Sequence, residues 1–145
     1  MNSNLYEQNF YAWTQEQAQH LRTGTITLLD WSNLAEEIED MGKNLRRELE
    51  SRLKVLFSYL LKWQYQPSHR GHSLQYTIEE QRNELLDHLA DNPSLQSKLP
   101  KAIQRDYRNA IVVAARETGL AKSTYPLECP WALEQALNTE FWPEA

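Results

Sequence analysis

The sequence predicts an all-α fold: a single-domain helical bundle of about five helices, one of them long and extending over about residues 31–64. Three observations support this prediction. Apolar side chains recur at steps of three or four along most of the chain, glycine and proline stand where these patterns stop, and no stretch alternates polar and apolar residues far enough to form a strand. Because 145 residues are enough for one buried core, we expect residues 1–145 to form a single domain.

The first predicted helix starts near Ser3, which can cap it, and stops at Gly24. Aromatic and apolar residues recur along it at helical spacing, namely Tyr6, Phe10, Trp13 and Leu21. The segment TGTITLLD follows and is expected to be a short connector.

Asp30 is a good N-cap for the long second helix, which Pro67 terminates. The apolar stripe of this helix is the strongest structural signal in the chain and consists of Trp31, Leu34, Ile38, Met41, Leu45, Leu49, Leu53, Leu56, Leu60 and Trp63. Its charged residues form opposite-charge pairs four residues apart, such as Glu39 with Lys43, so we expect a solvated face opposite the stripe. Gly42 lies on the apolar side, where close approach by a neighbouring helix would offset its cost of about 1 kcal/mol.

Two more long helices and a short one complete the prediction. The third follows the loop QPSHRGHS and runs to about Asp91, and a short helical turn is expected in NPSLQSKLP. The fourth ends at Gly119, and its centre, AIVVAA, is apolar nearly all round, so we expect other helices to surround it. Pro130 is expected at the first position of the last, short helix.

Composition and charge exclude several classes of protein. A net charge of −5 and an isoelectric point near 5.4 disfavour duplex nucleic acid, because such binding depends on clustered Lys and Arg side chains. No window is apolar over the length of a membrane span, and the N-terminus lacks the basic and apolar regions of a signal peptide. The single cysteine, Cys129, cannot form an intramolecular disulfide. We therefore expect a cytoplasmic protein that binds neither duplex nucleic acid nor membranes.

Five segments carry a resemblance to a known family. They are LAEEIEDMGK, RRELESRLKVLFSYLLKWQYQP, IEEQR, ETGL and CPWALEQAL, and together they span nearly the whole chain. In these segments the chain resembles the domain of unknown function 29 family, an uncharacterised and mainly bacterial set of small helical proteins. The resemblance implies a helical fold, and it implies no catalytic or binding residues because the family offers none that are agreed.

Several polar residues fall on helix faces that should be buried. On a helical wheel Arg52 lies within the apolar stripe of the long helix, and Glu48, one turn earlier, is its obvious partner. Gln81 and Arg82 flank the stripe of the third helix, and Glu117 shares the apolar side of the fourth. Because buried charges require partners, we predict that these five residues form a buried polar network, which either is structural or binds a ligand.

A metal site is the alternative that the histidines and carboxylates leave open. His69 and His72 lie in one loop and are spaced so that both imidazoles can reach the same ion. Because two protein ligands are too few for a catalytic metal, Glu37, Glu48 or His88 would have to complete the site. Such a site would make the protein a metal-dependent hydrolase, in which a divalent metal activates a water molecule.

The function that we expect first is a protein-interaction or regulatory module. Aromatic residues gather near both ends of the chain, with Tyr6 and Trp13 near the start and Trp131 and Trp142 near the end. Because aromatic side chains are enriched at interfaces, these four residues are the predicted surface for a protein partner or for self-association. The same side chains can instead cover the core.

Overall fold

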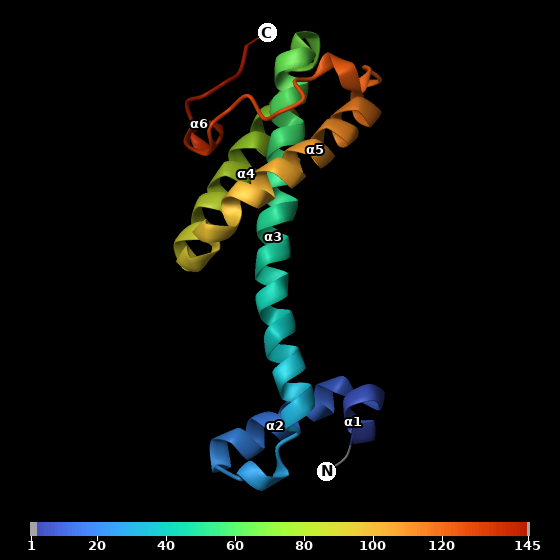
Figure 1. Cartoon of the computed structure of the whole chain (residues 1–145), viewed down its shortest axis with the longest axis vertical. Coiled ribbons are helices and arrows are strands. Elements are labelled where there is room, and N and C mark those ends of the chain that lie inside the picture. The colour runs from blue at the N-terminus through green and yellow to red at the C-terminus, as the bar shows by residue number, and fades with distance from the viewer. Residues whose placement is uncertain (1–2, 145) are drawn as a thin grey trace. The chain divides into compact units, whose positions relative to one another are not determined.

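The computed structural model describes residues 3–144, which form an all-α fold (Figure 1). The α-helices in this range are α1 (Ser3–Gln8), α2 (Phe10–Thr23), α3 (Trp31–Tyr65), α4 (His72–Asp91), α5 (Leu99–Thr118) and α6 (Leu133–Leu137), and none of these residues is in a strand. The predicted fold class and the long second helix are confirmed. None of the described helices combines the length and the apolar character needed to cross a membrane.

Contacts within the chain define two compact units, Met1–Leu45 and Arg46–Ala145, and the boundary between them falls inside α3. The first unit holds α1, α2 and the first part of α3, and the second holds the rest of α3 with α4, α5 and α6. Compactness alone does not show that either unit folds independently, so the single domain stays a prediction.

The first predicted helix is in fact two helices, which is a correction. Asn9 separates α1 from α2, and its side-chain oxygen accepts a hydrogen bond from the backbone N–H of Ala12 at 3.1 Å. An asparagine side chain that competes for a backbone donor in this way ends one helix and caps the next. Gly24 ends α2 with a φ of 72°, as predicted. The cap predicted at Ser3 lies outside the described side chains.

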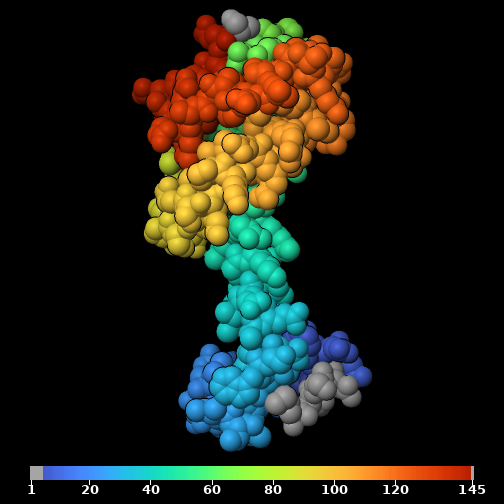
Figure 2. Space-filling view, in the orientation of Figure 1, coloured from blue at the N-terminus to red at the C-terminus, as the bar shows by residue number. Residues whose placement is uncertain are grey.

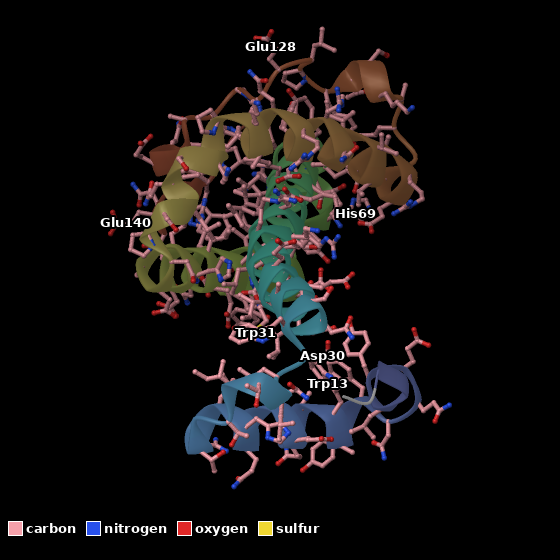
Figure 3. All side chains as sticks on the ribbon, turned by 60° about the horizontal axis from the view of Figure 1, so that its bottom comes forward. Trp13, Asp30, Trp31, His69, Glu128 and Glu140 are labelled. Carbon is pink, nitrogen blue, oxygen red and sulfur yellow. The ribbon has the colours of Figure 1, made fainter. Side chains whose placement is uncertain are left out.

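Asp30 joins α2 to the start of α3. Its carboxylate accepts hydrogen bonds from the indole N–H of Trp13 at 3.0 Å and from the side-chain amide of Asn33 at 2.8 Å (Figure 3). Its backbone N–H donates to the side-chain oxygen of Gln17 at 2.8 Å. The bonds from Asn33 and Trp13 hold the pKa of Asp30 below its ordinary value, although burial acts in the opposite direction. Because Asn33 also donates its backbone N–H to this carboxylate, the predicted N-cap is confirmed.

The second unit has a continuous hydrophobic core to which four helices contribute. Figure 1 shows α5 crossing the C-terminal half of α3 with α4 beside it, and Figure 2 shows the orange-to-red segment after α5 spread over one face of this unit. The fully buried side chains at its centre include Leu49, Leu56, Leu60, Leu61, Ile78, Leu85, Ala110, Ala114 and Ala136. The stripe predicted for the long helix is therefore buried from Leu49 to Leu60, and Trp63 is partly buried against the same core.

Two expectations about the second unit are wrong in detail. Val112, at the centre of AIVVAA, is exposed, because only the side of α5 that carries Ala110 and Ala114 faces the core. Pro130 is not the first residue of the last helix, since α6 begins at Leu133 after an extended Ala132 with a ψ of 154°. Trp131 precedes this helix and is nevertheless buried against the core.

Gly42 has no neighbour where the sequence predicted one. A Cβ placed on Gly42 would meet no described atom within 4 Å, so the expected close approach by another helix of this chain is wrong. The eight residues from position 41 to position 48 are all exposed. Met41, next to Gly42 on this part of α3, is 59% exposed.

Replacing Asp30 tests its role as the cap of α3. Asp30→Ala is expected to lower the free energy of unfolding by about 2 kcal/mol, because it removes a helix cap and leaves a buried indole N–H without an acceptor. Chemical denaturation followed by circular dichroism measures the change. Asp40→Ala removes an acid from the interior of the same helix and is the control, with an expected change below about 0.5 kcal/mol. Equal losses in the two variants would contradict the capping role.

Candidate functional site

Arg52 is the centre of a polar cluster on α3 and α4. Its guanidinium lies 3.3 Å from the carboxylate of Glu48 and donates to the side-chain oxygen of Gln81 at 3.3 Å. Glu84 lies 3.6 Å from the same guanidinium, and His88 Nδ1 lies 3.1 Å from Glu48. The structure thus brings together three members of the predicted network, Glu48, Arg52 and Gln81, and adds two from α4. We call these five residues the Arg52 cluster.

The Arg52 cluster lies at the surface, whereas the sequence predicted a buried network. The exposed fraction of the side chain is 27% for Arg52 and 45% for Glu48, and only His88 is buried. The stripe position of Arg52 is occupied by its aliphatic stem, and its charged end reaches solvent. Ion pairs that are exposed to this degree contribute no more than about 1 kcal/mol each, because solvent screens them.

Arg82 is buried, as predicted, but lies outside the Arg52 cluster. Its guanidinium donates to the backbone carbonyl of Ala136 at 2.8 Å and to that of Phe141 at 2.6 Å, and it lies 5.1 Å from the ring of Trp142. Burial lowers its pKa, and the nearby charge of Glu79 acts in the opposite direction. Arg82 therefore ties the segment around α6 to α4 by binding carbonyl oxygens, so its partners are backbone groups that no sequence motif marks.

Glu117 is the second predicted network residue that lies elsewhere. It accepts a hydrogen bond from Lys62 and so links the end of α5 to the end of α3, and its side chain is 43% exposed. The neighbouring Gln66 side chain donates to the backbone carbonyl of Thr118 at 3.3 Å. Glu117 thus takes part in a surface link between two helix ends, separate from the Arg52 cluster.

The candidate metal ligands are not gathered into one site. Among the residues that the structure describes, no group of three or more His, Cys, Asp or Glu side chains could hold a metal ion. Glu48 and His88 are adjacent and supply two such groups. Glu37 belongs to the first unit, where it accepts a hydrogen bond from the hydroxyl of Tyr6 that raises the pKa of Tyr6 to about 12.

The two loop histidines lie in separate surroundings. His69 Nδ1 is 3.1 Å from the hydroxyl of Ser68, and the ring of His72, the first residue of α4, packs 5.8 Å from the ring of Tyr76. The chain between them turns from a short 3₁₀ helix (Pro67–His69) into α4.

The aromatic residues near the start of the chain cover the core of the first unit. Trp13 is only 2% exposed, and the half-buried ring of Tyr6 lies 4.8 Å from it in an edge-to-face arrangement. Trp13 also donates to Asp30, as described above. These two members of the predicted partner surface are therefore mostly occupied by contacts within the chain.

The aromatic residues near the end of the chain cover the core of the second unit. Trp131 is buried, with its ring 6.4 Å from that of Phe57, and the half-buried ring of Trp142 lies 4.5 Å from that of Trp63. The sequence left open whether these rings cover the core or bind a partner, and the packing matches the first possibility. Aromatic content alone could not distinguish the two, because both roles bury apolar area.

A groove of about 1100 Å³ runs along α5 in the second unit. Tyr107, Ile111 and Trp131 are among its apolar lining residues, and Arg108 and Lys122 add positive charge. The lining also carries hydroxyl and thiol groups. Burial raises the pKa of the Tyr107 hydroxyl and of the Cys129 thiol. A thiol of raised pKa is a poor nucleophile, and the Tyr107 hydroxyl is already committed to the carbonyl of Pro126 at 2.7 Å.

Asp106 is a buried acid that the sequence analysis missed. It lies on α5 and is 4% exposed, and its Oδ2 has no hydrogen-bond partner among the described residues. Burial, together with the negative charge of Glu50, raises its pKa to about 6, while Arg105 and Lys54 partly oppose the shift. The sequence spacing could have indicated this burial, because Ala102, Asp106 and Ala110 follow one another at helical steps along the buried face of α5.

The first part of α3 carries several exposed apolar side chains. Trp31, Ile38 and Met41 expose 59%, 63% and 59% of their surface. We call the face formed by Trp31, Leu34, Ile38, Met41 and Leu45 the seam surface. The sequence analysis identified these residues but placed them in the core, since the same spacing continues into the buried part of the helix.

The fold and these sites define an all-α protein with an exposed apolar helix face, and its described residues hold no group of three or more metal-binding side chains. One family model, described as Domain of unknown function DUF29, matches residues 5–142. The chain therefore belongs to this family, as its sequence resemblance indicated. No match was found among curated proteins or among solved structures.

Asp106 provides a test that depends on pH. Its raised pKa means that the folded protein binds this proton more tightly than the unfolded chain, so the acid costs stability as the pH rises from 3.8, its ordinary pKa, to about 6. Asp106→Asn is expected to raise the free energy of unfolding at neutral pH by up to about 3 kcal/mol and to have little effect below the lower of these pKa values. Denaturation at both pH values measures this difference. Asp87→Asn, on an exposed face of α4, is the control, and a gain that did not depend on pH would contradict the assignment.

Arg82 provides a test of the tie between α4 and the C-terminal segment. Arg82→Lys is expected to lower the free energy of unfolding by about 2 kcal/mol or more, because one ammonium group cannot reach both carbonyls and one of them then lacks a donor. Urea denaturation measures the loss. Arg108→Lys, which changes an exposed arginine of α5, should have a much smaller effect. A similar stability for the two variants would show that the buried bonds of Arg82 contribute nothing.

Proposed function

We propose that this protein is a helical protein-interaction module that binds its partner on the seam surface of α3. The observation that supports the proposal is the concentration of exposed apolar side chains in the first unit. Nine of the thirteen exposed large hydrophobic residues among the described side chains lie between Phe10 and Leu45, although the second unit is the larger one. Exposed apolar side chains concentrated in one region of a protein are typical of a site of association.

The first unit has too little core of its own to cover these side chains. Among its described side chains, the buried hydrophobic ones are Trp13 and Leu29. Burying a large apolar side chain stabilises by about 1.5–3 kcal/mol. Covering Trp31, Ile38 and Met41 would therefore stabilise the complex by several times that amount, from which the cost of association has to be subtracted. Binding would therefore stabilise the unit that has the least internal packing.

The other surfaces support this function less well. The charges of the Arg52 cluster pair with one another, and the groove along α5 holds no poised nucleophile among the described residues. The single cysteine suits a reducing compartment, and we place the module in the cytoplasm on that ground. We favour a protein as the partner, because the seam surface is apolar and is flanked by charges of both signs.

Photo-cross-linking from a single position tests the proposal. A photoreactive phenylalanine analogue at Met41 is expected to give a covalent adduct with a protein in living cells, because Met41 would lie inside the interface. The same analogue at Lys43, about 160° around the helix from Met41, is expected to give none. Ile38→Asp should abolish the Met41 adduct without changing the helix content. Adducts from both positions alike, or from neither, would overturn the proposal.

A further inference from the structure

The groove along α5 has an apolar floor that belongs entirely to the second unit. One wall is a face of α5, and the other wall is formed by residues 122–131, which follow that helix. Tyr107, Ile111 and Trp131 form the floor and are buried side chains of the hydrophobic core. Because a core packs these side chains firmly, the groove offers a preformed apolar surface to a ligand.

Two cationic side chains border the groove and have no counter-ion in the described part of the chain. Arg108 belongs to α5, and Lys122 begins the short 3₁₀ helix that follows it. Both residues are exposed, and the side chain of neither makes an ion pair or a hydrogen bond with the described residues. Arg105, one turn earlier on α5, is by contrast paired with Glu50. Arg108 and Lys122 are therefore available to an anion.

The acidic side chains of the lining do not neutralise these two cations. Among the described residues that line the groove, Glu128 is the one acid, and it forms no ion pair with Arg108 or Lys122. The chain as a whole carries a net charge of −5. A lining with a positive balance is thus a local exception, and its electrostatic potential favours an anionic ligand over a cationic one.

The dimensions of the groove indicate a long ligand. The lining residues on α5 run from Pro100 to Val112, which is about 18 Å at the rise of an α-helix. The volume of about 1100 Å³ slightly exceeds the range of about 300–1,000 Å³ that is usual for small-molecule sites. A short carboxylic acid would leave most of the apolar floor uncovered, whereas a long hydrocarbon chain would cover it.

The hydrogen bonds of the floor favour a hydrocarbon chain over a polypeptide. The Tyr107 hydroxyl donates to the carbonyl of Pro126 at 2.7 Å, and the Cys129 thiol donates to the carbonyl of Trp131 at 3.4 Å. Both donors are therefore already used within the chain. A polypeptide in the groove would need partners for its own backbone N–H and C=O groups, while a hydrocarbon chain needs none.

We propose that the groove along α5 binds a long-chain carboxylate, with its hydrocarbon chain on the apolar floor and its carboxylate attracted by Arg108 and Lys122. A guanidinium can bind a carboxylate through two parallel hydrogen bonds, and an ammonium group adds a compact positive charge. This site lies in the second unit, so the inference goes beyond the proposed function and does not depend on the seam surface.

Two amphiphiles with the same hydrocarbon chain and opposite charges test the site. Isothermal titration calorimetry of the full-length protein measures the binding of dodecanoate and of dodecyltrimethylammonium, each below its micelle concentration. Dodecanoate is expected to bind at one saturable site, about tenfold or more tighter than dodecyltrimethylammonium, because the charges of the groove attract one head group and repel the other. Decanoate, which is two methylene groups shorter, is expected to bind about tenfold more weakly than dodecanoate.

Reversing the charges of the groove tests which residues select the anion. The double variant Arg108→Glu with Lys122→Glu is expected to lose about tenfold or more in affinity for dodecanoate and to prefer dodecyltrimethylammonium. Arg47→Glu with Arg116→Glu makes the same change of net charge at exposed positions outside the lining and is the control. The control is expected to keep the preference of the wild type, and circular dichroism verifies that all the proteins keep their helix content.

Cys129 reports where the hydrocarbon chain lies. It is the single cysteine of the chain and is part of the groove lining, so modification by a thiol reagent can be followed by intact mass. Dodecanoate is expected to slow this modification, with half of the effect at the dissociation constant that calorimetry gives. The double variant should show no protection at the same concentrations.

Several results would overturn the inference. They are the absence of saturable dodecanoate binding, equal affinity for the two amphiphiles, and a double variant that binds like its control. Binding that leaves the modification rate of Cys129 unchanged would place the ligand elsewhere and would also overturn it. None of these results bears on the cross-linking from Met41, so the failure of this inference and that of the proposed function are distinguishable.

Discussion

The length of α3 is the constraint on which the rest of the structure depends. This helix runs from Trp31 to Tyr65 without a break, and one apolar stripe continues along it. The helices of the second unit cover the stripe from Leu49 onward, whereas Ile38 and Met41 stay exposed. Apolar surface left in water forgoes about 25 cal/mol per Å² of stabilisation, so the uncovered part of the stripe favours association. The same sequence pattern thus builds a core in one unit and an exposed apolar face in the other.

Two charged residues, Arg82 and Asp106, are buried in the second unit and affect its stability in opposite directions. Arg82 satisfies the carbonyls of Ala136 and Phe141, and in this way holds a segment that has only one short helix of its own against α4. Asp106 acts in the opposite direction, because its carboxylate is buried without a full set of donors and its pKa rises to about 6. A polar group in a core stabilises when its partners are backbone groups placed by the fold, and it costs stability when they are absent.

The histidines and carboxylates that could carry chemistry are spread over different parts of the chain. Glu48 and His88 meet at one edge of the second unit, while His69, His72 and Glu37 each have a different neighbour. Catalysis and metal binding both require several such groups around one point, whereas association requires only a continuous face. The exposed apolar side chains of α3, such as Trp31, Ile38 and Met41, lie on one face of that helix.

The sequence by itself determined the all-α class, the long helix, the cap at Asp30 and the helix end at Gly24, because these depend on local spacing and on backbone conformation. It also placed Glu48 beside Arg52, since residues four apart share a helix face. Only the tertiary structure decided which half of the apolar stripe is buried, that Arg82 binds distant carbonyls, and that Gly42 has open space beside it. These depend on contacts between segments far apart in the chain. The spacing of apolar residues along a helix is the same whether the surface that covers them belongs to the same chain or to another molecule.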